Sequence, residues 1–269
     1  MNKAIYRYEL RQRWSSVGVW AGSLAGLLLT FMALFPSFSA DMAVINQIME
    51  NFPPEFKAMF GLNALNFATL EGYFGFCFVL CQLCLAIQAA NYGLSLVSVE
   101  EAELTADFLL TRPLSRPTIL TSKLLATLTS LLVTQIILWA VSLASIAMFK
   151  GEVHYEPRAI FLLLGSGLIF QLIFFSVGLL LSLLVRRMHS VTPWSLGLAF
   201  GTYVISAFSG ILGDVKLEYL SPFKHFEPGK IIRNLQYDTR LVLLDAALII
   251  LAVSVSYWLY QKRDIASPS

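Results

Sequence analysis

The segment SVEEAELTADFLLTRPLSRP, residues 98–117, is a charged interruption in a sequence that is otherwise mostly apolar. It carries four carboxylates, two arginines and two prolines, and uncharged runs lie on both sides, at residues 72–99 and 124–149. Charged side chains at this density are too costly to place in hydrocarbon. We therefore expect the segment to project into water from a chain that spans a membrane.

The composition of the whole chain agrees with a membrane protein. Hydrophobic residues make up 57% of the 269 residues and charged residues 13%, about half the charged share of an ordinary soluble domain. Such a sequence lacks the polar surface that a soluble globule needs. The net charge of +2 gives no indication of nucleic-acid binding, and the three cysteines lie in one apolar run without a metal-ligand spacing.

Six apolar runs approach or exceed the roughly 20 residues that a membrane-spanning helix needs. We expect spans at about residues 17–36, 73–97, 119–148, 159–185, 191–212 and 241–260, all within a single membrane domain of residues 1–269. An even number of spans places both termini on one side of the membrane. The short loops on that side carry the excess of Lys and Arg, which favours cytoplasmic termini.

Residues 3–14 are predicted to form a helix that lies at the membrane interface. Lys3, Arg7 and Arg11 recur at every fourth residue beside Tyr6 and Trp14, so one face meets lipid headgroups and another meets acyl chains. An ordinary basic flank of the first span is the alternative interpretation.

The second expected span carries a line of small and polar residues. Steps of three and four residues place them along one helix face; the members are Cys77, Cys81, Cys84, Gln88, Asn91, Ser95 and Ser98. Packing against other helices is one interpretation, since small and polar residues are favoured where membrane helices touch. Lining of a transport pathway is the other, and in a dimer one face could serve both roles.

Two features of the last two expected spans are also informative. Gly197 and Gly201 in the fifth span have the spacing that lets another helix approach closely. Asp245, the only acid within an expected span, is interpreted as a carboxylate favoured by the positive helix N-terminus, with a proton relay as the alternative. Residues 214–240 between these spans are expected to form a structured outer loop with short helices.

Residues 100–112 are predicted to form a short amphipathic helix on the cytoplasmic side. Glu100, Glu103 and Asp107 share one face, and Pro113 ends the helix. The chain contains no GxxxxGK[ST], GxSxG or HExxH pattern, so we expect no catalytic residue, no bound metal and no cofactor in it.

This segment resembles the second-to-third loop of the membrane subunits of ABC-2-type transporters. That loop commonly has two acids, Gly-Thr, an acid, Leu-Leu, Pro-x-x-Arg and Gly-Lys. The matching residues are Glu100-Glu101, Thr105, Asp107, Leu109-Leu110, Pro113, Arg116 and Lys123, whereas Leu104 and Ser122 stand where the family usually has Gly. Ser221-Pro222-Phe223 and Lys262-Arg263-Asp264 also look like the family.

The resemblance implies an all-α, type V ABC exporter-like fold with six transmembrane helices, an N-terminal interfacial helix and a cytoplasmic coupling helix at about residues 100–112. In the family this helix docks in a separate ATPase subunit, which binds ATP and Mg. The residues that the resemblance assigns to this contact are Glu100, Glu101, Glu103, Thr105, Asp107, Phe108 and Arg112. It also implies two ATPase copies, a second permease copy as in a homodimer, and membrane lipid as the surroundings.

The resemblance further implies a multi-pass protein of a bacterial or archaeal plasma membrane, with both termini cytoplasmic. Spans two and five usually form the dimer interface or pathway; the candidates there are Cys84, Gln88, Asn91, Ser95, Gly197 and Gly201. The expected function is the permease subunit of an ATP-driven exporter of an amphipathic compound such as a drug, peptide antibiotic or lipid. The alternatives are a non-transporting sensor or assembly module coupled to the ATPase, a sodium or other ion extruder, and an intramembrane enzyme.

Overall fold

The computed structural model describes residues 1–40, 47, 51–53, 57, 61, 65–67, 69–102, 115–185, 188, 190–212 and 215–262. Over these ranges the chain is helical and has no strand. Its long helices are α1 (Lys3–Ala40), α4 (Leu70–Ala102), α6 (Arg116–Phe149), α7 (Pro157–Leu184), α8 (Thr192–Leu212) and α12 (Thr239–Lys262). Three short helices, α9 (Val215–Glu218), α10 (Pro222–His225) and α11 (Pro228–Asn234), connect α8 to α12.

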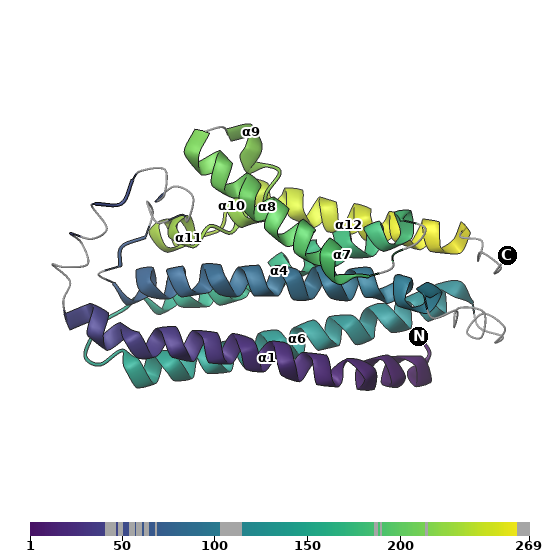
Figure 1. Cartoon of the computed structure of the whole chain (residues 1–269), viewed down its shortest axis with the longest axis horizontal. Coiled ribbons are helices and arrows are strands. Elements are labelled where there is room, and N and C mark those ends of the chain that lie inside the picture. Colours follow the sequence, from purple (N-terminus) through teal and green to yellow (C-terminus); the bar gives the residue numbers. More distant parts are fainter. Residues whose placement is uncertain are drawn as a thin grey trace.

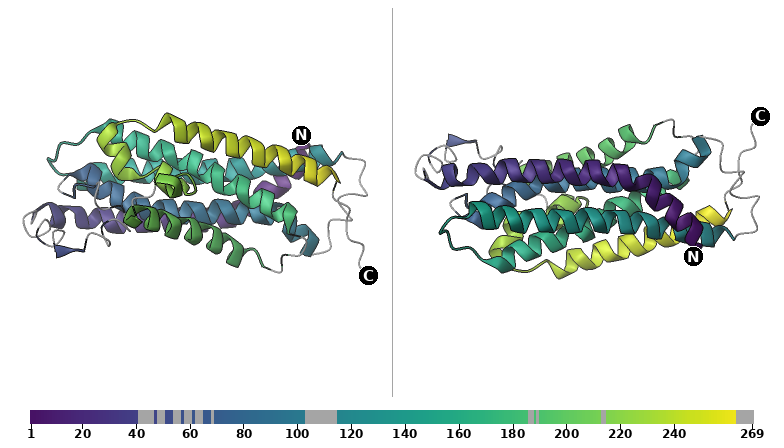
Figure 2. Two further views of the ribbon diagram at one scale, coloured as in Figure 1. Left: turned by 90° about the horizontal axis from the view of Figure 1, so that it is seen from above. Right: turned by 90° about the horizontal axis from the view of Figure 1, so that it is seen from below.

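The six long helices are long and apolar enough to cross a membrane, which confirms the predicted number of spans. Each expected span overlaps one of them. The main difference is at the N-terminus, where α1 is continuous from Lys3 to Ala40. Residues 3–14 are thus its first turns and not a separate helix, although Figure 2 shows them inclined to the rest of α1. Their place at a membrane interface stays a prediction.

Local sequence explains where several helices begin and end. Proline occupies one of the first two positions of both α6 and α7, where its missing N–H removes no helical hydrogen bond. The Glu156 side chain accepts the backbone N–H of Arg158 at 3.1 Å and so caps α7. Gly151 follows the end of α6 with φ +58°, a left-handed conformation that glycine adopts without strain.

Helices α4 and α7 form the centre of the bundle. They pack against each other along their length; α1 packs on α6 and α4, while α8 packs on α4 and α12 on α7. The N-terminus and the end of α12 lie at one end of the bundle, together with the end of α4 and the start of α6, while α11 lies at the opposite end (Figure 1). We call the first of these the termini end.

Glycine permits the closest contact between the two central helices. A Cβ added to Gly93 on α4 would lie 2.2 Å from the carbonyl oxygen of Phe175, and one added to Gly178 on α7 would lie 2.7 Å from that of Ala90. In a lipid bilayer the hydrophobic effect does not favour contact between helices. Membrane helices therefore associate through van der Waals packing, which close approach of their backbones increases. This contact fixes the register between α4 and α7.

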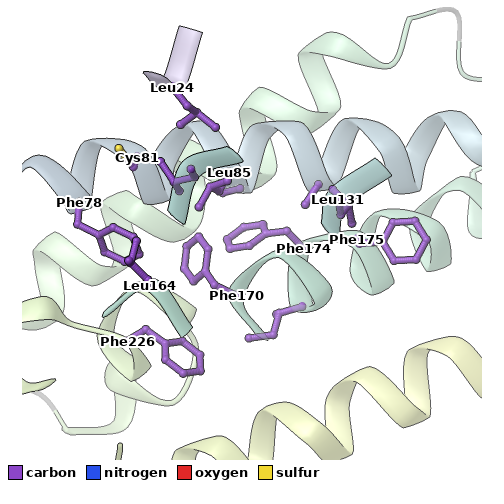
Figure 3. Packing of buried hydrophobic residues seen from close by; sticks show 14 of the residues in the cluster. Leu24, Phe78, Cys81, Leu85, Leu131, Leu164, Phe170, Phe174, Phe175 and Phe226 are labelled. Atoms are coloured by element: carbon purple, nitrogen blue, oxygen red, sulfur yellow. The ribbon is translucent and has the colours of Figure 1, made fainter. Parts of the chain in front are cut away.

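A buried aromatic cluster connects the central helices to the loop between α8 and α12. The rings of Phe170 and Phe174 on α7 pack against Phe223, and Phe170 also packs against Phe226. Figure 3 shows Phe226 below Phe170 and close to Leu164. Residues 221–226, here called the re-entrant segment, thus extend into the bundle from the loop.

The depth of the re-entrant segment follows from its contact with α4. The amide Nε2 of Gln82 donates a buried hydrogen bond of 2.9 Å to the carbonyl oxygen of Phe226. Gln82 lies about 18 Å along α4 from Leu70, at 1.5 Å per residue. The region therefore has the short helices expected from the sequence, and part of it reaches well into the apolar bundle.

Candidate functional site

The residues expected to contact an ATPase fall mostly outside the part of the chain that the structure describes. Glu100 and Glu101 belong to the last turn of α4. The others lie within residues 103–114, outside the described ranges; they are Glu103, Thr105, Asp107, Phe108 and Arg112. The coupling-helix assignment therefore stays a prediction, and the described neighbours show only what such a helix would move.

Three charged residues lie on or beside the helices that flank residues 103–114; Glu9 and Lys123 are buried and Arg13 is partly buried. Lys123 on α6 donates to the carbonyl oxygen of Leu96 on α4 at 3.1 Å, and its Nζ lies 3.8 Å from Oε1 of Glu9 on α1. Arg13, one turn after Glu9, lies 3.7 Å from the other carboxylate oxygen and donates to Ser95 Oγ at 3.3 Å. We call Glu9, Arg13 and Lys123 the basal ion cluster.

The basal ion cluster connects three helices at the termini end. Lys123 is 2% exposed and Glu9 is 7% exposed, and charges this deeply buried are tolerated only when they are paired and hydrogen-bonded. Leu96 and Lys123 lie roughly 10 Å, along their helices, from the points where α4 ends and α6 begins. Movement of the intervening loop would therefore act on α1 as well as on α4 and α6.

Sequence reasoning missed this cluster. Lys123 was assigned only to the family motif, and Glu9 and Arg13 were given no structural role. The available signal was the spacing of Glu9 and Arg13, which places opposite charges on one helix face.

The predicted polar line on α4 divides between an interior and an open face. Cys84, Asn91 and Ser95 are half-buried and share a stripe with Leu80 and Ile87. The remaining members, Cys77, Cys81, Gln88 and Ser98, are buried. The structure therefore places three of the four α4 candidates on the face that α4 leaves partly uncovered.

Gln88 is the α4 candidate that lies inside the bundle. Its Nε2 donates to Thr134 Oγ1 on α6 at 2.9 Å, and its Oε1 accepts from Gln171 Nε2 on α7 at 3.2 Å. These buried bonds connect the three helices within one chain. For Gln88 the structure supports the packing interpretation.

Gly197 and Gly201 lie on an exposed face of α8. A Cβ added to either glycine would meet no atom within 4 Å, so no other helix of this chain approaches them among the described residues. The same holds for Gly18, Gly22 and Gly26 on α1, whose four-residue spacing was a signal not considered in the sequence analysis. Figure 1 shows α4 between α1 and α8, and α4 contacts both helices.

Asp245 has a different environment from the one expected. It lies two turns inside α12, is 1% exposed, and its Oδ1 is 2.9 Å from Nδ1 of His225. The helix N-terminus acts mainly within the first turn, so the interpretation based on it is wrong. The histidine partner could not be predicted, because His225 belongs to the loop of residues 214–240, which is expected to lie outside the spans.

The comparisons with known proteins concern nearly the whole chain. The family model described as ABC-2 family transporter protein matches residues 3–265. No curated protein matches the chain. The family match extends from the first turns of α1 past the end of α12, and so includes every helix described above.

Proposed function

We propose that this chain, which belongs to the ABC-2 transporter family, is the permease subunit of an ATP-driven exporter in a bacterial or archaeal plasma membrane. Two copies form the substrate pathway, and two separate ATPase subunits bind ATP and Mg. The family match over residues 3–265 carries the proposal. The positions of the N-terminus, the end of α4, the start of α6 and the end of α12 at one end of the bundle support it, because the ATPases would then dock at that end.

The contacts of α4 suggest how ATP-driven movement reaches the pathway. Residues 100–112 receive the force from the ATPase and pass it to the adjoining end of α4. Because α4 is a single helix in close backbone contact with α7, it moves together with α7. The basal ion cluster transfers the same movement to α1.

Replacing three residues of the coupling segment tests this function. We expect E101A/D107A/F108A to weaken ATPase binding at least about tenfold, roughly 1.4 kcal/mol, because it removes two charges and one aromatic anchor. Co-purification of tagged ATPase and titration of its activity in nanodiscs would measure the loss. E152A/Y219A, two exposed positions away from the termini end, is the control.

Two results would contradict the proposal. One is ATP hydrolysis by the purified chain without a partner. The other is an unchanged ATPase affinity in the triple variant with normal folding. Substrate-stimulated ATPase activity in vesicles separates an exporter from a non-transporting sensor, since only the exporter moves its ligand across the bilayer.

The open stripe of α4 supports an amphipathic substrate. Above Ser95, which is bound to Arg13, it combines Leu80 and Ile87 with the neutral amide of Asn91. An uncharged stripe of this kind suits a compound such as a drug, peptide antibiotic or lipid better than a strongly charged solute, whose desolvation it would not compensate.

Cross-linking between copies tests the proposed dimer face. We expect a short bismaleimide to join two chains through Cys84 or through an introduced G201C, because these positions lie on the open faces of α4 and α8. L251C is the control, since Leu251 is exposed and belongs to α12, which lies across the bundle from α8 (Figure 2). Cys77 and Cys81 are buried within the chain. Equal cross-linking of L251C, or none at Cys84 and G201C, would rule out this face.

A further inference from the structure

The re-entrant segment is held by neutral hydrogen bonds on two of its sides. Ser221 Oγ donates to the carbonyl oxygen of Thr202 on α8 at 2.8 Å. Gln82 on α4 donates to the carbonyl oxygen of Phe226 at 2.9 Å. Neither bond involves a group that titrates near neutral pH.

The contact with α12 is different, because both of its partners titrate. Nδ1 of His225 lies 2.9 Å from Oδ1 of Asp245, and Nε2 of His225 lies 3.0 Å from the carbonyl oxygen of Glu218. The two side chains are 3% and 2% exposed. Oδ2 of Asp245 is also buried and has no hydrogen-bond partner among the described residues.

The carbonyl oxygen of Glu218, which faces Nε2 of His225, determines which hydrogen atoms the imidazole ring carries. A carbonyl oxygen can only accept, so Nε2 carries a hydrogen and donates it to Glu218. Nδ1 then faces a carboxylate oxygen, and this contact requires one proton between the two atoms. The pair is either imidazolium with carboxylate or neutral imidazole with carboxylic acid, and in both forms it is neutral overall and holds that proton.

The structure assigns to His225 and Asp245 a proton-binding site whose occupation holds the re-entrant segment against α12. Loss of the proton would set the Nδ1 lone pair against a buried carboxylate, which is strongly unfavourable in an apolar bundle. The site would then open. This inference concerns the chain by itself and does not rest on the proposed function.

The other titratable groups around the site are already paired or exposed. Lys224 pairs with Glu227 at 3.1 Å, and Lys230 pairs with Glu218 at 3.2 Å. On α8 the group that faces the segment is Tyr203, whose ring packs on Phe223. Burial raises the pKa of Tyr237, which donates to the carbonyl oxygen of Leu162. The remaining charged residues of α9, α11 and the start of α12 are exposed; they are Lys216, Arg233, Asp238 and Arg240.

The proton count gives the direction of the pH dependence. An exposed histidine loses its proton near pH 6.5 and an exposed aspartate near pH 3.9. Opening the contact releases the proton of the pair to water, so closing becomes less favourable as the pH rises.

Maleimide labelling of S221C measures the opening. Ser221 is fully buried in the segment, and cysteine has nearly its shape. The labelling rate is divided at each pH by that of N234C, an exposed position on α11, which corrects for the fraction of thiolate. Labelling of the chain without an added cysteine is subtracted to remove the contribution of the native thiols.

We expect the corrected rate to rise as the pH is raised from about 6 to 9, by at most about tenfold per pH unit because one proton is released. D245N should label slowly at every pH, because its amide can donate to Nδ1 and replace the proton. D245A should label rapidly at every pH, because it has no group to bind the imidazole. If D245N does not fold, H225Q takes its place as the test. We expect H225Q to remove the pH dependence as well.

Two outcomes would overturn the inference. A pH slope retained in D245N or H225Q would mean that another group titrates. A flat, slow rate from about pH 6 to 9 in the unmodified pair would mean that the proton does not control the contact.

Discussion

G93A is expected to prevent the chain from forming its bundle, whereas G22A should fold like the unmodified chain. The new methyl carbon of G93A would lie 2.2 Å from the carbonyl oxygen of Phe175, far inside van der Waals contact. That oxygen belongs to the backbone of α7 and cannot rotate away. The two central helices would have to separate, at a cost above the roughly 1–3 kcal/mol of ordinary overpacking.

The control substitution makes the same chemical change where no neighbour exists. A Cβ on Gly22 meets no atom within 4 Å, and alanine favours helix over glycine by about 1 kcal/mol. Recovery as a single peak in size-exclusion chromatography and the thermal unfolding temperature would compare the variants. G178A, with its contact at 2.7 Å, should fall between them. An unfolding temperature for G93A equal to that of G22A would disprove the close contact of α4 with α7.

The six spans could be predicted because length and apolarity alone define them. A run of about 20 uncharged residues has few alternatives to a membrane helix. The division of the α4 line could not be predicted in this way. Successive members such as Gln88 and Asn91 differ by about 60° around the helix axis. A rotation of this size is hard to detect in a sequence pattern. Because neighbouring helices enclose most of α4, it is nevertheless enough to bury the Gln88 amide and leave the Asn91 amide half-exposed.

The buried ionic groups escaped prediction for another reason. His225 and Asp245 come from different elements, and only the return of the re-entrant segment into the bundle brings them together. Lys123 lies within the expected span 119–148 but just before the uncharged run 124–149, so the sequence places it near the cytoplasmic end of that span. The structure begins α6 at Arg116, so Lys123 lies two turns inside the helix and is covered by α1 and α4.

K123M is expected to destabilise the chain by about 3–5 kcal/mol, the usual cost of removing one partner from a buried ion pair. Methionine fills nearly the same volume, so the loss would come from charge and hydrogen bonding. Glu9 would keep only Arg13, at 3.7 Å, and the carbonyl oxygen of Leu96 would lose the donor at 3.1 Å. K262M, an exposed position at the same end of the bundle, should change the unfolding temperature by no more than about 2 °C.

The double variant E9Q/K123M separates stability from coupling. Glutamine removes the carboxylate that K123M leaves underpaired, so the double variant should regain much of the lost stability, and the two changes should not be additive. A chain restored in this way lacks the ionic connection between α1 and α6 but keeps residues 100–112. It should therefore bind the ATPase normally and transport less substrate per ATP hydrolysed. Additive destabilisation would show that Glu9 and Lys123 do not interact. Normal transport per ATP in a stable double variant would show that the cluster supports the fold and does not transmit movement to α1.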